Sequence, residues 1–90
     1  MAVDTKRDQQ LVSAYVEPDP NHSGRANAWV KDRFVHVWVI IGHLKATGWD
    51  TAETMRAYGL TADMVDAAEA YYRLNREYID AKLLLESDYD

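Results

Sequence analysis

The side chains of this 90-residue chain that could coordinate a metal ion are its three histidines and its many carboxylates. His22 lies in a polar stretch, His36 ends an apolar run, and His43 falls on the polar side of an expected helix. None of them has the H-x-x-x-H or H-x-x-E spacing that aims two ligands at one ion. The sequence therefore predicts no metal site.

Nucleophilic catalysis and phosphate binding have equally little support. The serines, Ser13, Ser23 and Ser87, stand outside any G-x-S-x-G context. Gly24 and Gly42 are isolated, so the chain has no glycine-rich loop that could surround a phosphate. We therefore expect neither a catalytic serine nor a nucleotide cofactor.

Acidic residues gather at helical spacing in the second half of the chain, as Asp63, Asp66 and Glu69. Such a group could act as a pair of general acids and bases if burial shifted the pKa of one member. A solvated helix face explains them more simply, because acids near a helix N-terminus are stabilised there. We expect a protein that is not an enzyme and uses no cofactor.

Amino-acid composition excludes several further classes of protein. The chain has no cysteine, which excludes disulfides and thiolate zinc sites and fits a reducing compartment. It has neither a leader-like apolar segment at its start nor the roughly 18 apolar residues of a membrane span. We expect a soluble cytoplasmic protein that makes no contact with membranes.

The net charge of -5 is unevenly distributed. Residues 1–48 carry six Lys or Arg against five Asp or Glu, whereas residues 49–90 carry four against ten. The excess of 4 - 10 = -6 lies on the C-terminal half. That half is a poor surface for nucleic acid phosphates and a suitable one for a basic partner.

The elements that position these residues form a single domain. The sequence predicts flexible residues 1–10, a β element and loop over residues 11–37, and a helical region over residues 38–86. Two β-like runs, residues 11–17 and 28–37, flank the polar loop at residues 17–27. The second run could be one bent strand or a tight hairpin.

From Val37 the periodicity becomes helical. Val37, Ile40, Ile41 and Leu44 recur at i, i+3, i+4 and i+7, and Gly48 follows where a left-handed C-terminal cap is expected. Asp50 and Glu53 have the capping-box spacing at the start of a second helix, TAETMRAY, which Gly59 would end.

Thr61 is placed to cap a third helix, with Leu60 and Val65 spaced as a hydrophobic staple. Because no Pro or Gly follows, this helix could run for about six turns. The predicted fold is mainly α, with a small N-terminal β element and a helix-turn-helix-like three-helix domain whose third helix is long.

A helix-turn-helix enters the major groove through the N-terminal turns of its second helix. The exposed positions there are Thr61, Ala62, Asp63, Asp66, Glu69 and Ala70. They include three carboxylates and no Arg, Lys, Asn or Gln, so repulsion from phosphates opposes DNA binding through this helix.

Basic side chains that could contact DNA lie elsewhere, at Arg25, Lys31 and Arg33, on or beside the β-like runs. A two-stranded ribbon from a dimer can enter a groove, which keeps a DNA-binding transcriptional regulator open as an alternative function. Asp32 interrupts the patch, and a mixed-charge strand edge is the simpler interpretation.

The apolar band of the long third helix is wide for so small a domain. Its last part, residues 78–85, is a candidate surface for a second copy or for another protein. Alternatively, the chain could fold back and cover this part with its own N-terminus.

Residues 24–80, about two thirds of the chain, resemble the bacterial family called domain of unknown function 433. The resemblance rests on five segments: GRA (24–26), WVKDRFVHVW (29–38), GWDTAE (48–53), YGLTADMVDAAEAYY (58–72) and REYID (76–80). The sequence departs from the family where Asp32, Arg33 and Phe34 replace the usual G-T-R turn. Any role of that turn is therefore not carried over.

The resemblance implies a helix-turn-helix-like fold, often dimeric, and a role as the antitoxin of a toxin–antitoxin pair whose toxin is a PIN-like ribonuclease. An antitoxin of this kind commonly covers its toxin with a C-terminal helix that has an apolar stripe. The expected partner-binding residues are Tyr78, Ile79, Leu83 and Leu84, followed by the acidic Glu86, Asp88 and Asp90. The expected partners are a second copy of the chain, a cognate ribonuclease and, for the regulator alternative, operator DNA.

Overall fold

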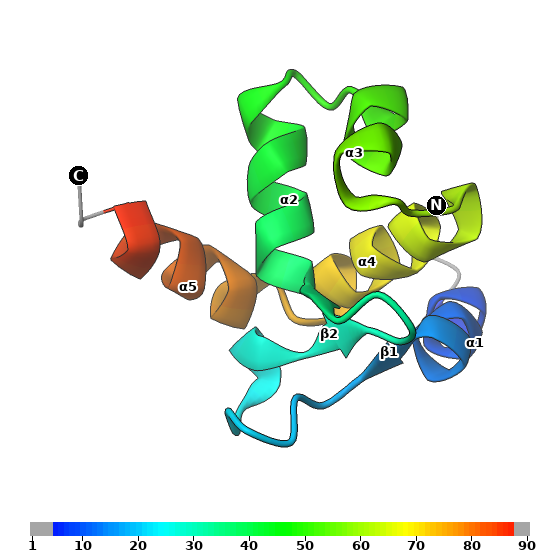
Figure 1. The fold of residues 1–90 in the computed structure, drawn as a ribbon. Coiled ribbons are helices and arrows are strands. Elements are labelled where there is room, and N and C mark those ends of the chain that lie inside the picture. The colour runs from blue at the N-terminus through cyan, green and yellow to red at the C-terminus, as the bar shows by residue number, and fades with distance from the viewer. Residues whose placement is uncertain (1–4, 88–90) are drawn as a thin grey trace.

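The computed structural model describes residues 5–87, and within them the chain is mainly helical with one small antiparallel sheet (Figure 1). The elements are α1 (Thr5–Tyr15), β1 (Val16–Glu17), η1 (Arg25–Asn27), β2 (Trp29–Val30), β3 (Val35–His36), α2 (Val37–Ala46), α3 (Thr51–Tyr58), α4 (Ala62–Leu74) and α5 (Arg76–Ser87). The prediction of a mainly α fold is confirmed, but the described residues form five α-helices instead of three.

The sheet has the order β1-β2-β3, with Val16 opposite Val30 and Trp29 opposite His36. The second β-like run is therefore a hairpin and not a bent strand. Its turn contains Asp32 at φ 69° and Phe34 at φ 56°, both left-handed. Aspartate tolerates this conformation better than most residues do.

The N-terminal segment differs from the prediction. Residues 5–15 form a helix, and only Val16 and Glu17 of the first β-like run form a strand. Helix α1 packs along α4, with Leu11, Val12 and Tyr15 against the core. Contacts with a helix far along the sequence stabilise α1, and a local sequence pattern does not reveal such contacts.

Helices α2, α3 and α4 begin where the three predicted helices were expected, although α4 is shorter than the predicted third helix. Ile40, Ile41 and Leu44 of α2 are fully buried, and Gly59 ends α3 in the left-handed conformation at φ 66°. The Thr61 hydroxyl then accepts a hydrogen bond from the Met64 amide at 3.2 Å, which caps α4. The predicted helix boundaries around the turn are confirmed.

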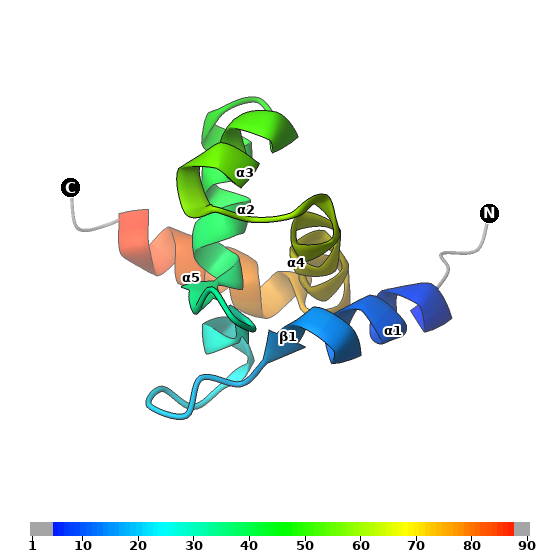
Figure 2. The same cartoon turned by 45° about the vertical axis from the view of Figure 1, so that its right-hand side comes forward.

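The prediction of a long third helix is wrong. Helix α4 ends at Leu74 and α5 begins at Arg76, with Asn75 between them at φ -135° and ψ 35°. Helix α5 turns away and packs on α2 and η1. Figure 2 shows α1 and α5 leaving opposite sides of the α2–α4 body.

Candidate interaction surface

Exposed apolar side chains collect on α5 and the end of α4. Large hydrophobic side chains are exposed at six described positions: Phe34, Trp49, Leu74, Tyr78, Leu84 and Leu85. Leu84 and Leu85 are 67% and 61% exposed, and Tyr78 is 47% exposed. At about 100° per residue these three lie on one side of α5. We call Tyr78, Leu84 and Leu85 the α5 outer face.

The four predicted partner-binding residues divide between two faces of α5. Ile79 is fully buried, and Leu83 packs against the core. Leu83 Cδ2 lies 3.0 Å from the position that a Cβ on Gly42 would occupy, so the two helices are in close contact there. Ile79 and Leu83 therefore hold α5 on the domain, whereas Tyr78 and Leu84 are exposed.

A polar cluster fixes the angle of α5. The Asp80 carboxylate accepts hydrogen bonds from the Tyr72 hydroxyl at 2.7 Å and from Lys45 Nζ at 3.2 Å. The Tyr72 bond is the main reason why the pKa of Asp80 lies below its ordinary value, and Lys45 adds to the effect against partial burial. One carboxylate of α5 thus joins α4 and α2.

The three basic candidates do not form one patch. The Arg25 guanidinium lies 5.1 Å above the ring of Tyr78 on α5. Lys31 Nζ donates to the Ser13 carbonyl of α1 at 2.9 Å. Arg33 is exposed in the hairpin turn. Two of the three side chains are thus occupied by contacts within the chain, in separate places.

Helix α1 partly covers the face of α4 that a helix-turn-helix protein would insert into a DNA groove. Ala70 is buried, and Asp63 accepts a hydrogen bond from the Tyr15 hydroxyl at 3.2 Å. The negative charge of Asp63 is the main cause of a raised pKa at Tyr15. Ala70 is therefore not available to a groove, and Asp63 has a partner on α1.

A bidentate ion pair reinforces the same contact. Arg73 Nε and Nη2 donate to the two Asp8 oxygens at 3.0 and 2.9 Å. Glu69, one turn before Arg73 on α4, accepts a hydrogen bond from the Trp49 indole at 2.8 Å.

Two histidines that looked unrelated in the sequence meet at one buried carboxylate. His36 Nε2 and His22 Nδ1 lie 2.9 and 3.1 Å from the same Asp19 oxygen, and the Asn21 amide donates to the other at 2.8 Å. Burial by itself would raise the pKa of Asp19, but the three hydrogen bonds outweigh it and leave that pKa lowered. The D-P-N stretch hinted at this turn, since Asp commonly accepts from the amide two residues later.

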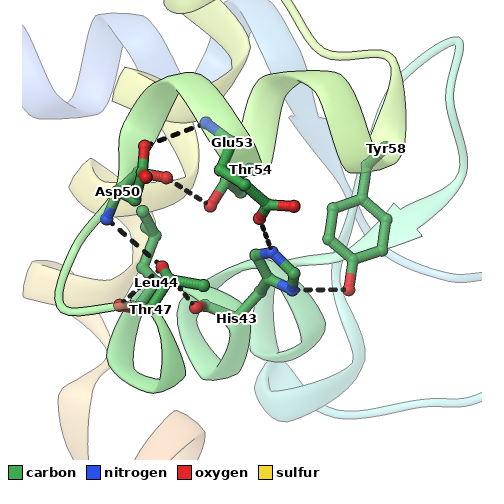
Figure 3. A network of polar contacts seen from close by, with 7 residues as sticks. All are labelled: His43, Leu44, Thr47, Asp50, Glu53, Thr54 and Tyr58. Carbon is green, nitrogen blue, oxygen red and sulfur yellow. Dashed lines mark hydrogen bonds and ion pairs between the residues drawn. The ribbon is translucent and has the colours of Figure 1, made fainter.

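The third histidine belongs to the junction of α2 and α3 (Figure 3). His43 Nε2 contacts the Glu53 carboxylate, and its Nδ1 lies 3.5 Å from the Tyr58 hydroxyl. Asp50 accepts from the Glu53 amide at 3.0 Å, so half of the predicted capping box forms. The Glu53 side chain is turned to His43, and the Asp50 amide instead donates to Thr47 Oγ1 at 3.2 Å. The network holds α3 against α2.

A small apolar pocket of 380 Å³ lies between α1, β1 and α4. The residues that line it include Val12, Val16, Arg25, Ala28 and Tyr71. The Tyr71 hydroxyl donates to the Arg25 carbonyl at 2.5 Å, so it is already engaged in holding η1 on α4.

Within residues 5–87, no three His, Asp or Glu side chains are placed to hold a metal ion. No helix in that range is long and apolar enough to cross a membrane. In comparisons with known proteins, no family model matches the chain, and neither a curated protein nor a solved structure is significantly similar to it.

Proposed function

We propose that this protein is a non-catalytic binding module that holds a protein partner on the α5 outer face. The observation that carries the proposal is the exposure of Tyr78, Leu84 and Leu85 on a helix whose opposite side is fastened to the domain. Exposed apolar side chains grouped on one element mark protein interaction sites more often than isolated ones do. Because Ile79 and Leu83 fix α5, the outer face is presented without a prior folding step, which lowers the entropic cost of binding.

The partner we propose is a ribonuclease toxin of the PIN-like type, with this chain as its antitoxin. The resemblance of residues 24–80 to domain of unknown function 433 supports the assignment, as does the charge of the C-terminal half. An enzyme that binds RNA carries a basic surface, and acidic side chains around an apolar anchor would complement it. Glu77 and Glu86 border the outer face and are both exposed.

The experiment is affinity capture of the tagged chain from its native host at moderate salt, with mass spectrometry and light scattering on the eluate. We expect a stoichiometric protein that cleaves RNA once it is freed, and whose cleavage stops when the purified chain is added back. A pure homodimer without such a nuclease would contradict the antitoxin proposal and favour the DNA-binding regulator.

Substitutions on α5 and on the hairpin then test which surface binds the nuclease. Leu84→Asp combined with Leu85→Asp should reduce capture of the nuclease at least tenfold, because each buried leucine contributes about 1.5 to 3 kcal/mol to an interface. Phe34→Asp is the matched control, since Phe34 is 60% exposed but lies on the hairpin. Equal capture by the double variant and the control would remove α5 from the binding surface.

A further inference from the structure

The bend between α4 and α5 is made by a single residue. The Asn75 amide donates to the carbonyls of Tyr71 at 2.9 Å and Tyr72 at 3.2 Å, as the end of α4. Its own carbonyl accepts from the amides of Tyr78 and Ile79, both at 3.1 Å, as the start of α5. Asn75 is therefore the single residue that links α4 to α5.

Nothing in the local sequence requires a bend at this point. No Pro or Gly occurs between Leu60 and Ser87. In the described chain, the helix is interrupted at Asn75: the Tyr78 amide bonds to the carbonyl of Asn75 and not to that of Leu74. Two further bonds of a continuous helix, from Arg76 to Tyr72 and from Glu77 to Arg73, are not made. Straightening would form both bonds, which favours one continuous helix over residues 62–87.

Tertiary contacts of α5 oppose the straightening. Ile79 and Leu83 are packed on the domain, and Asp80 bonds to Tyr72 and Lys45. Eight residues of straight helix span about 12 Å, so Tyr72 and Asp80 of one chain could not keep their bond in a continuous helix. The bent form is stabilised by the site on which α5 lies.

We propose that α5 is an exchangeable arm, and that in a homodimer the α5 of each copy occupies the α5 site of the other. A straightened helix of 26 residues is about 39 Å long and carries α5 clear of its own domain. Straightening uncovers the surface of the domain on which α5 lies in the bent form. The α5 of a second copy has the same sequence and fits this surface in the same way. Ile79, Leu83 and Asp80 would then make their contacts between chains. The dimer keeps the contacts of Ile79, Leu83 and Asp80 and gains two backbone bonds at each hinge.

The exchange leaves the α5 outer face exposed, so it is compatible with partner binding and does not depend on it. Its occupant is a second copy of this chain, whatever the identity of another partner. An exchanged dimer would present two outer faces in a fixed relation.

The first test compares two substitutions at the hinge. Asn75→Ala and Asn75→Gly both remove the bond from Asn75 Nδ2 to the Tyr71 carbonyl at 3.1 Å, and they differ only in helix preference. Since the dimer contains two hinges, its association constant should be about 30-fold larger for the alanine than for the glycine variant. Light scattering coupled to size exclusion over a concentration series measures it, with circular dichroism to establish that both variants fold. Equal association constants for the two folded variants would overturn the proposal.

The second test identifies which chain supplies α5. The natural chain has no cysteine, so Gly42→Cys and Leu83→Cys can be placed in separate chains, mixed while unfolded, refolded together and oxidised. We expect a disulfide-linked dimer in the mixture and none in either variant alone. If Gly42→Cys prevents folding, Lys45→Cys and Asp80→Cys with a short bismaleimide linker replace the pair, since both side chains are half exposed. A dimer that forms without cross-linking in the mixture would overturn the exchange.

Discussion

Asp8 and Arg73 form an ion pair between α1 and α4. The side chain of Asp8 is 5% exposed and that of Arg73 is 40% exposed. The hydrogen bonds from Arg73 are the largest influence on Asp8 and lower its pKa, against the opposing effect of burial. A two-bond Arg–carboxylate pair is geometrically specific, which makes it suited to fixing α1 in one position on α4.

This pair should make folding sensitive to acid. Because the folded pKa of Asp8 lies below the ordinary value of 3.8, the unfolded chain binds more protons between the two pKa values. Stability from Asp8 is thus fully present above the unfolded pKa and is lost as pH falls through the folded one. Urea unfolding is measured from neutral pH down through this range. At neutral pH, Asp8→Asn should be less stable than the natural chain by about 1 to 3 kcal/mol, and its stability should fall less steeply as the pH is lowered.

The pKa values of Asp19 and Asp80 are also lowered. The Asp8→Asn variant should therefore still lose some stability as the pH falls. Glu77→Gln is the control, since Glu77 is an exposed carboxylate on α5. An acid slope in Asp8→Asn as steep as in the natural chain would mean that the ion pair contributes nothing to folding.

At the element scale, the turn between α3 and α4 depends on one glycine. Gly59 has φ 66°, and a Cβ added there would meet nothing within 4 Å. The cost of Gly59→Ala is therefore backbone strain alone, about 1 to 2 kcal/mol. Thermal unfolding should show this loss, and Gly59→Asn should recover most of it because asparagine adopts the left-handed conformation more readily. An alanine variant as stable as the natural chain would show that the turn can relax to another conformation.

The elements that the sequence predicted correctly are those whose signals are local. Gly59, Thr61 and the apolar repeat of α2 act within one or two turns, so the tri-helical unit could be located from residue types and spacing. The elements it missed depend on distant contacts. Helix α1 is held by Arg73 and Asp63, and the bend at Asn75 by the packing of α5 on α2.

The sequence placed the candidate surface on residues 78–85, and the structure divides those residues between two faces of α5. Helical periodicity groups Tyr78, Ile79, Leu83 and Leu84 as one apolar band on a continuous helix. Once α5 turns at Asn75, Ile79 and Leu83 face the domain, and Leu85 joins Tyr78 and Leu84 outside. Which apolar residues are available to a partner follows from the direction of the helix, and this is set by tertiary packing.

The net charge of the molecule and the packing of its helices both oppose DNA binding through α4. The chain has a net charge of -5, and α1 lies along the helix that would have to enter a DNA groove. Arg25 and Lys31 contact α5 and α1, so a phosphate would have to displace both contacts. These contacts oppose the binding of DNA through α4 and through Arg25 and Lys31.

We therefore expect duplex DNA to bind no more tightly than the 10⁻⁴ to 10⁻⁶ M that is typical of non-specific binding. Fluorescence anisotropy of a labelled duplex at low and at physiological salt measures this affinity. The paired variant Arg25→Ala with Arg33→Ala should leave the signal unchanged, because neither side chain belongs to a shared basic patch. Tighter binding that weakens steeply with salt and is lost in the paired variant would instead place DNA on the hairpin side of the domain. In that event the regulator would replace the antitoxin as the leading function, and the exchanged dimer would set the distance between its two DNA contacts.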